Sequence, residues 1–170
     1  MLELKDFEAA ADRLKNVIHN IPLSTSCTFS AMTGAEVYLK YENQQKTGSF
    51  KVRGAYNKIM KRFAEGDLHA VVASSAGNHA QGVAFAATAA GVKSTIVMPR
   101  SAPIAKVSAT QGYGAEVVLA GNIYDEAYAK RARSARRPAQ SSSTRLTMRM
   151  LWRVRAPSRW KSCATCRALT

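Results

Sequence analysis

The sequence has little cysteine, with three such residues among 170. They are Cys27, Cys163 and Cys166, too few and too irregularly spaced for the disulfide framework of a small secreted domain. Cys163 and Cys166 form a single C-x-x-C pair, but no second pair and no histidine follows to complete a zinc site. We therefore expect no metal centre, and a reducing cytoplasm is the compartment that fits best.

Long hydrophobic runs are also missing. No apolar stretch approaches the roughly 20 residues that a helix needs to span a bilayer. Residues 1–20 mix acidic, basic and apolar side chains and lack the unbroken apolar core of a secretory signal peptide. The sequence therefore predicts neither a membrane span nor an export signal.

Acidic residues are absent from the last part of the chain. Residues 1–130 carry 14 Lys or Arg and 11 Asp or Glu, whereas residues 131–170 carry 11 Lys or Arg and no acid. Most of the formal net charge of +14 therefore belongs to this tail. One interpretation is a disordered basic arm for nucleic acid or a membrane surface, because like charges repel one another and attract phosphates. The other is that the tail did not evolve as part of a folded protein.

The first third of the chain is expected to contain a helix, a loop, a short strand and the start of a second helix. Residues 3–18 place apolar side chains at helical spacing, and Pro22 ends that pattern before a Ser/Thr-rich loop. Residues 37–41 alternate toward a strand, and we expect a helix from Lys51 to about Phe63.

The middle of the chain alternates short β-branched runs with helical segments. The runs lie at residues 71–73, 95–98 and 117–119, and the helices at residues 79–90, from Pro103 to Thr110 and from Tyr124 onward. Gly91 and Gly114 follow two of these helices, where left-handed C-caps belong. This alternation is typical of βαβ units. The expected fold class is therefore α/β, an open parallel sheet with helices on both faces.

Lys51 stands between an aromatic ring, Phe50, and the start of the expected helix. A lysine is electrostatically unfavourable there, because the helix dipole repels a cation at its amino end. That environment lowers the pKa of the amine and favours a nucleophile that forms a Schiff base with an aldehyde. Phe50 could pack against a flat heterocycle beside it. The alternative is one more exposed lysine on a helix that also carries Lys58 and Lys61.

A second candidate site lies in the turn from Ser74 to His79, between the first β-branched run and the next helix. Small residues in such a turn let backbone N–H groups converge on a carboxylate or phosphate. Asn78 adds a neutral donor that could bind a phenolic oxygen without titrating. The alternative is an ordinary helix cap and turn, with no catalytic role for His79.

Together these motifs resemble threonine dehydratases (threonine ammonia-lyases). The resemblance is carried by Ser-Phe-Lys-x-Arg-Gly-Ala at residues 49–55, Ser-Ala-Gly-Asn-His-Ala-Gln-Gly at residues 75–82 and Val-Met-Pro at residues 97–99. It runs from about Phe7 to Lys130. Serine dehydratases and serine racemases are related members of the same tryptophan-synthase-β-like class of pyridoxal-phosphate enzymes.

The resemblance implies roles for particular residues. Lys51 would be the catalytic residue, holding pyridoxal 5'-phosphate as a Schiff base and then acting as base at the substrate α-carbon. Phe50 would flank the cofactor ring, and Asn78 would bind its ring oxygen. The substrate carboxylate would lie in the turn formed by Ser75, Ala76, Gly77, Asn78 and His79. The substrate would be L-threonine, with L-serine as a second possibility, and the intact parent would be a homo-oligomer without nucleic-acid or membrane partners.

Ala76 bears on the subtype. Racemases of this class usually carry a serine at this place, as the acid-base group on the face opposite the lysine. Alanine cannot carry that proton, so the resemblance implies elimination rather than racemisation. A serine racemase-like enzyme remains the alternative, and sulfhydrylases fit less well because their substrate loop is Thr-rich.

The resemblance implies that residues 1–50 belong to a large domain and residues 51–130 to a small one. The tail, residues 131–170, departs from the family pattern and is expected to be disordered. When residues 148–161 are read from the third base of each permitted codon, they can give Ala-Asp-Val-Val-Ala-Gly-Gln-Gly-Thr-Ile-Ala-Leu-Glu, which is the missing family segment. We therefore expect the tail to be frameshifted.

A frameshifted tail would leave the cofactor's phosphate loop and much of the large domain missing. Three hypotheses follow: a weakly active or inactive dehydratase, a basic nucleic-acid-binding module, and a non-catalytic fragment.

Overall fold

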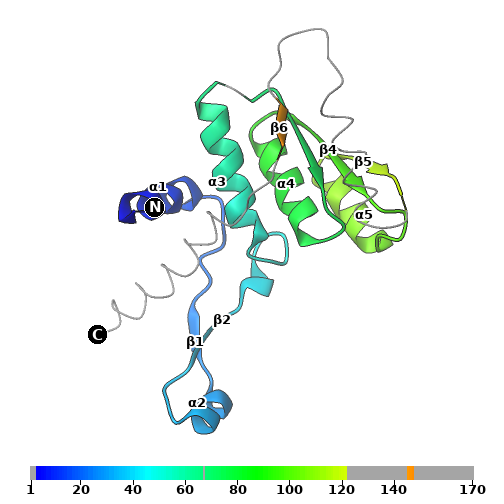
Figure 1. The fold of residues 1–170 in the computed structure, drawn as a ribbon. Helices are drawn as coiled ribbons and strands as arrows, with labels where there is room; N and C mark the ends of the chain where they lie inside the picture. Colours follow the sequence, from blue (N-terminus) through cyan, green and yellow to red (C-terminus); the bar gives the residue numbers. More distant parts are fainter. Residues whose placement is uncertain (1–2, 67, 122–144, 148–170) are drawn as a thin grey trace.

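The computed structural model describes residues 3–66, 68–121 and 145–147. It contains a four-stranded parallel sheet in the order β5-β4-β3-β6 and a separate two-stranded antiparallel sheet (Figure 1). The parallel strands are β3 (Ala70–Ser74), β4 (Lys93–Met98), β5 (Glu116–Leu119) and β6 (Arg145–Thr147). The predicted α/β class is confirmed, with each expected β-branched run forming a strand.

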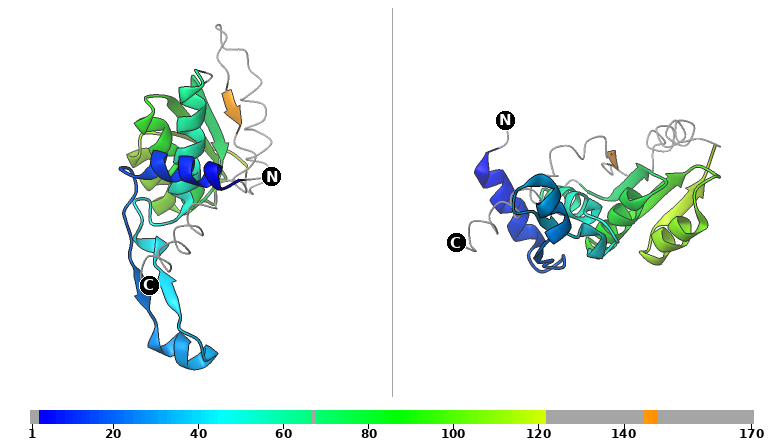
Figure 2. Two further views of the ribbon diagram at one scale, coloured as in Figure 1. Left: turned by 90° about the vertical axis from the view of Figure 1, so that its left-hand side faces the viewer. Right: turned by 90° about the horizontal axis from the view of Figure 1, so that it is seen from below.

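Two helices connect the parallel strands. They are α4 (Asn78–Ala89), between β3 and β4, and α5 (Ile104–Gly112), between β4 and β5. Both cover the same face of the sheet (Figure 2), as right-handed crossovers require when successive strands are added in one direction. The helix expected from Tyr124 onward lies outside the described residues. Gly91 and Gly114 have φ values of 68° and 87°, which confirms the predicted left-handed caps.

The hydrophobic core lies between the sheet, α4 and α3 (Lys51–Ala64). Its fully buried members include Ile59 from α3, Val83 from α4, and Val71 and Ile96 from the sheet. Many members of this core are alanines, and α3 and α4 approach closely at Gly82. That close approach fixes where α3 begins relative to α4.

The amino-terminal segments lie to one side of this core. Helix α1 (Leu4–Leu14) packs across α3, and it is shorter than the helix expected over residues 3–18. Strands β1 (Leu23–Thr25) and β2 (Tyr38–Lys40) form an arm that projects from the rest of the described chain (Figure 2). The short helix η1 (Glu42–Gln44) then leads toward Lys51.

The predicted Ser/Thr-rich loop after Pro22 is wrong in part. It contains β1 and a further helix, α2 (Cys27–Thr33), at the tip of the arm. Ser26 caps α2 by accepting a hydrogen bond from the Phe29 N–H, and Gly34 ends it with a φ of 69°. Phe29 and Met32 on this helix are exposed.

Strand β6 corrects another expectation. Residues 145–147 belong to the tail that was expected to be disordered, yet they pair in parallel with β3 at Ala70–Val72. The rest of residues 131–170, including Cys163 and Cys166, lies outside the described residues. The frameshift and the domain limits at residues 50 and 130 remain predictions.

Candidate active site

The end of β3 is where the order of the parallel strands reverses. The chain leaves β3 to build β4 and β5 on one side, whereas β6 lies on the other. In open α/β sheets, ligands bind outside the carboxyl ends of the strands at such a point. Ser74 is the last residue of β3, so the turn that precedes α4 begins at this place.

Lys51 and this turn are brought together by a close contact between two helices. An added Cβ at Gly82 of α4 would lie 3.2 Å from the carbonyl carbon and oxygen of Lys51 and from the amide nitrogen of Val52. A side chain at this position would be tightly packed against that backbone, so glycine favours the close approach of the first turn of α3 to the second turn of α4. The start of α3, which carries Lys51, is thereby placed beside the start of α4.

The loop before Lys51 is anchored at several points. The buried side chain of Gln45 accepts from the His19 N–H at 2.7 Å and donates to the His19 carbonyl at 3.0 Å. The Tyr113 hydroxyl donates to the Lys46 carbonyl at 2.9 Å. These bonds tie the loop both to the segment after α1 and to the end of α5.

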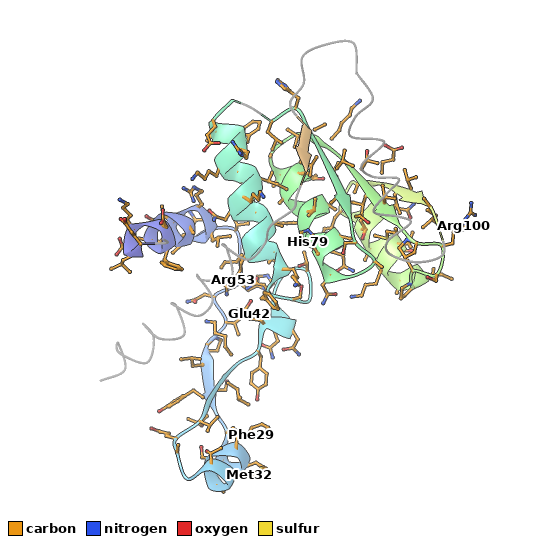
Figure 3. All side chains as sticks on the ribbon, in the orientation of Figure 1. Phe29, Met32, Glu42, Arg53, His79 and Arg100 are labelled. Atoms are coloured by element: carbon orange, nitrogen blue, oxygen red, sulfur yellow. The ribbon has the colours of Figure 1, made fainter. Side chains whose placement is uncertain are left out.

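Arg53, two residues after Lys51 in the sequence, forms a bidentate ion pair with Glu42 (Figure 3). Arg53 Nε and Nη2 donate to the two carboxylate oxygens of Glu42 at 3.0 and 2.5 Å. Arg53 is 1% exposed, so its charge depends on this partner. The pair fixes η1 against the first turn of α3, and hence fixes the position of Lys51.

Phe50 and Lys51 are neighbours in space as well as in sequence. Lys51 Nζ lies 4.8 Å from the centroid of the Phe50 ring, within the range of a cation–π contact. The Lys51 N–H is directed to the Ser49 hydroxyl at 3.4 Å, and Ser49 is buried. The aromatic ring and the amine thus stand together at the amino end of α3.

The turn before α4 leaves its backbone accessible to a ligand. Ser75 N–H bonds the Val97 carbonyl of β4 at 3.2 Å, and Gly77 N–H bonds the Ser75 hydroxyl at 3.3 Å. A Cβ added to Gly77 would meet no heavy atom within 4 Å, so space lies open beside this residue. Asn78 and His79 then begin the helix, where N–H groups have no intrahelical acceptor.

His79 lies at the start of α4, on the side that faces α3 (Figure 3). Burial, together with the positive charges of Lys51 and Lys58, lowers the pKa of His79 to about 4. Its buried Nδ1 has no hydrogen-bond partner. His79 is therefore neutral at pH 7, so it offers the start of α4 a backbone N–H but no positive charge.

Lys106 is the site residue that the sequence reasoning missed. It lies in the first turn of α5, and its Nζ donates to Asn78 Oδ1 at 2.5 Å. A signal was available, since Lys106 lies in the first turn of the helix that follows Pro103, and Lys51 lies in the first turn of the helix that follows Phe50. The roles of Gly82, Glu42 and Arg53 were also missed, because each depends on a contact distant in the sequence.

Two negative findings apply to the described residues alone. Among them, no group of three or more His, Cys, Asp or Glu side chains is placed to hold a metal ion. None of the helices that the structure describes is long and apolar enough to cross a membrane.

Proteins of known activity are similar to this chain over most of its length. L-threonine ammonia-lyase of Thermotoga maritima is 56% identical over 128 residues, which are 75% of this chain and 32% of that enzyme. L-threo-3-hydroxyaspartate ammonia-lyase of a Pseudomonas species is 51% identical over 122 residues, which are 71% of this chain and 38% of that enzyme. The chain thus spans about a third of the length of these relatives.

Solved structures give the same picture. Threonine deaminase from T.th. has a TM-score of 0.82 at 32% identity, with 99% of this chain and 53% of that chain covered. Maize serine racemase has a TM-score of 0.71 at 34% identity, with 77% of this chain and 40% of that chain covered.

A family model described as "pyridoxal-phosphate dependent enzyme" matches residues 14–147, well over half of the chain. The match continues beyond Lys130, where the resemblance seen in the sequence was expected to end, and it includes β6. The cofactor of this family is pyridoxal phosphate. The chain belongs to the family of pyridoxal-phosphate-dependent enzymes.

Proposed function

We propose that this chain carries the lysine-bearing half of the active site of an L-threonine ammonia-lyase. The supporting observation is the contact of Gly82 with Lys51, which sets the lysine beside the turn at residues 75–79. Both elements lie within a chain that is 56% identical, over 128 residues, to a relative named for this activity. L-threonine would lose water to give an enamine, and hydrolysis of the enamine would release ammonia and leave 2-oxobutanoate.

The described residues fit part of pyridoxal phosphate. Two polar atoms in or next to the turn are buried without a partner, Ser74 Oγ and His79 Nδ1, and open space lies beside Gly77. Lys51 supplies an amine for the cofactor aldehyde, and Asn78 supplies a neutral amide for the ring oxygen. The chain spans about a third of the length of its relatives, so the site formed here would be one half of the whole.

Each residue of this half-site has a proposed role. When bound, pyridoxal phosphate supplies an electron sink for the bond electrons at the substrate α-carbon. Lys51 holds the cofactor and then takes the proton from that carbon. Phe50 packs along the cofactor ring, and Asn78 donates a hydrogen bond to its ring oxygen. The turn formed by Ser75, Ala76, Gly77, Asn78 and His79 binds the substrate carboxylate through backbone N–H groups.

The turn also favours elimination over racemisation. Ala76 offers no hydroxyl to deliver a proton to the face of the α-carbon opposite Lys51. A hydroxyl at the substrate β-carbon can instead leave as water, and hydrolysis of the resulting enamine releases ammonia. The names of both relatives given above refer to 3-hydroxy amino acids as substrates. We therefore propose L-threonine as the first substrate and L-serine as the second.

The setting of the activity follows the same reasoning. We propose a cytoplasmic enzyme that acts on a small amino acid, with a homo-oligomeric intact parent and no nucleic-acid or membrane partner. Residues 1–50 would belong to a large domain and residues 51–130 to a small one. Because the chain spans about a third of its relatives, we expect weak or absent turnover by the chain alone.

An absorbance titration tests this function. The purified chain is mixed with pyridoxal phosphate, excess cofactor is removed, and the spectrum is compared with those of Lys51→Ala and of Lys61→Ala, an exposed lysine on the same helix. The proposal is supported if a band at the edge of the visible range is retained in the wild-type chain and in Lys61→Ala but not in Lys51→Ala. No band in any protein, or equal bands in all three, contradicts it.

The nucleic-acid hypothesis has its own test. Binding to an unrelated duplex at two salt concentrations would weaken steeply with salt if the basic tail held phosphates. The lysine–cofactor bond is covalent and would not depend on salt in this way.

A further inference from the structure

The hydrogen bond between Lys106 and Asn78 joins the first turns of two helices. Lys106 Nζ of α5 lies 2.5 Å from Asn78 Oδ1 of α4, and both side chains are half-buried. The two residues are 28 positions apart, so the contact exists only because β4 brings α5 back beside α4. No family role assigned above includes Lys106.

The chemistry of the two side chains determines the orientation of the amide. A lysine ammonium has three donors and no acceptor, whereas an asparagine amide has an acceptor at Oδ1 and two donors at Nδ2. The atom that meets Lys106 must therefore be the oxygen. The Nδ2 group of Asn78 must then face away from α5, and no acceptor for it is seen among residues 3–66 and 68–121.

Lys106 occupies a position that is electrostatically unfavourable for a cation. It stands in the first turn of α5, where the helix dipole disfavours a cation. None of the ion pairs formed within the described part of the chain includes it. Its main chain is fixed by the fully buried Thr110, whose hydroxyl donates to the Lys106 carbonyl at 2.7 Å. The amide oxygen of Asn78 is thus its established partner.

We propose that Lys106 is a positioning residue that fixes the amide of Asn78 so that Nδ2 donates to the ring oxygen of the cofactor. This inference rests on the proposed function, in which Asn78 binds that oxygen. Without Lys106 the amide can rotate, and its oxygen would then face the electron-rich ring oxygen for part of the time. A fixed donor stabilises the ionised ring oxygen, which sets both cofactor affinity and its absorbance.

The first arm of the test needs no cofactor. The side-chain amide signals of ¹⁵N-labelled chain are recorded for wild type, Lys106→Met, Lys106→Arg and Lys93→Met, and Asn78→Ala identifies the signal of Asn78. Lys93 is an exposed lysine at the start of β4 and serves as the control. A shift of the Asn78 signal in Lys106→Met, but not in Lys93→Met, supports the inference. An unchanged signal in Lys106→Met overturns it, whatever the cofactor does.

The second arm measures the cofactor. Lys106→Met should weaken binding of pyridoxal phosphate by about tenfold and move its band toward shorter wavelength, and Asn78→Ala should have the same effect. Lys106→Arg, which keeps a charged donor, should restore the wild-type band. The double variant Lys106→Met/Asn78→Ala should bind no more weakly than Asn78→Ala, because both changes remove one interaction.

These measurements distinguish a failure of the proposed function from a failure of the inference about Lys106. Absence of cofactor binding in wild type contradicts the proposed function, and the amide signal still decides whether Lys106 orients Asn78. A wild-type band in Lys106→Met, or additive losses in the double variant, overturns the inference while leaving the proposed function intact.

Discussion

The backbone of Lys51 lies so close to Gly82 that a Cβ added to the glycine would be 3.2 Å from the Lys51 carbonyl group, a tight contact. Gly82 has no chemistry of its own, but its missing Cβ lets α4 approach the residue that would bond the cofactor. Together with the Lys106–Asn78 bond, this contact gathers the first turns of α3, α4 and α5 at the end of β3. The candidate site is therefore a consequence of helix packing.

Gly82→Ala should destabilise the chain by about 1–3 kcal/mol, because the new methyl group must displace the backbone of Lys51. Cofactor binding should fall with it. Urea unfolding measures the first effect and the absorbance titration the second. Gly112→Ala is the matched control, since a Cβ at that helical position meets nothing within 4 Å. Equal stability of the two variants would show that the helices do not approach as closely as described.

Gly77→Ala should separate folding from binding. The added Cβ has no heavy atom within 4 Å, and the backbone is extended with a φ of −142°, so stability should change by less than about 0.5 kcal/mol. If a substrate carboxylate approaches this backbone, the same methyl group should obstruct it. Binding of L-threonine to the cofactor-loaded chain, followed by the change in its spectrum, should therefore weaken. Unchanged threonine binding in this variant would place the carboxylate elsewhere.

Glu42→Gln should cost about 3–5 kcal/mol, because it leaves the buried charge of Arg53 without its counter-charge. Chemical denaturation measures the loss. The control is Glu65→Gln in the exposed pair with Arg62, which should cost no more than about 1 kcal/mol. Similar losses in both variants would mean that the Arg53 pair is solvated. Adding Arg53→Met to Glu42→Gln should recover stability, since the uncompensated charge is then removed.

The free energy of unfolding should fall on acidification, because the pKa of His79 is lowered in the folded chain. Burial and the nearby lysines lower its pKa from 6.5 to about 4, so the unfolded chain binds a proton at pH values where the folded chain does not. The contribution of neutral His79 is present above about pH 6.5 and is lost as the pH falls toward 4, to a limit of about 3 kcal/mol.

The difference in unfolding free energy between wild type and His79→Gln isolates this effect from the carboxylates. It should move in favour of the glutamine variant between pH 6.5 and pH 4. His69→Gln, which alters an exposed histidine, is the matched control. A pH-independent difference for His79→Gln would contradict the assigned burial.

The elements that sequence reasoning identified correctly are those with strong local signals. The β-branched runs at residues 71–73 and 95–98 became β3 and β4 because their apolar residues fill the buried middle of a parallel sheet. The caps at Gly91 and Gly114 were also predictable, because left-handed backbone favours glycine. By contrast, α2 has seven residues and β1 three, too short for a periodic pattern.

The candidate site was predictable only where a motif carries it. Lys51 and Asn78 stood out by position, but their closeness depends on the Gly82 contact, which no sequence pattern reveals. Lys106 joins them through the sheet order, since α5 returns beside α4 after β4. The same order puts β6 beside β3, which the composition of residues 131–170 did not suggest.

The central claim is that Lys51 is the amine that bonds the cofactor. The most direct measurement is to load the chain with pyridoxal phosphate, reduce it with sodium borohydride so that the bond becomes permanent, and locate the label by peptide mass spectrometry. The account predicts one label per chain on the peptide that contains Lys51, and none on that of Lys58 or Lys106. Labels spread over several lysines, or undiminished in Lys51→Ala, would contradict it.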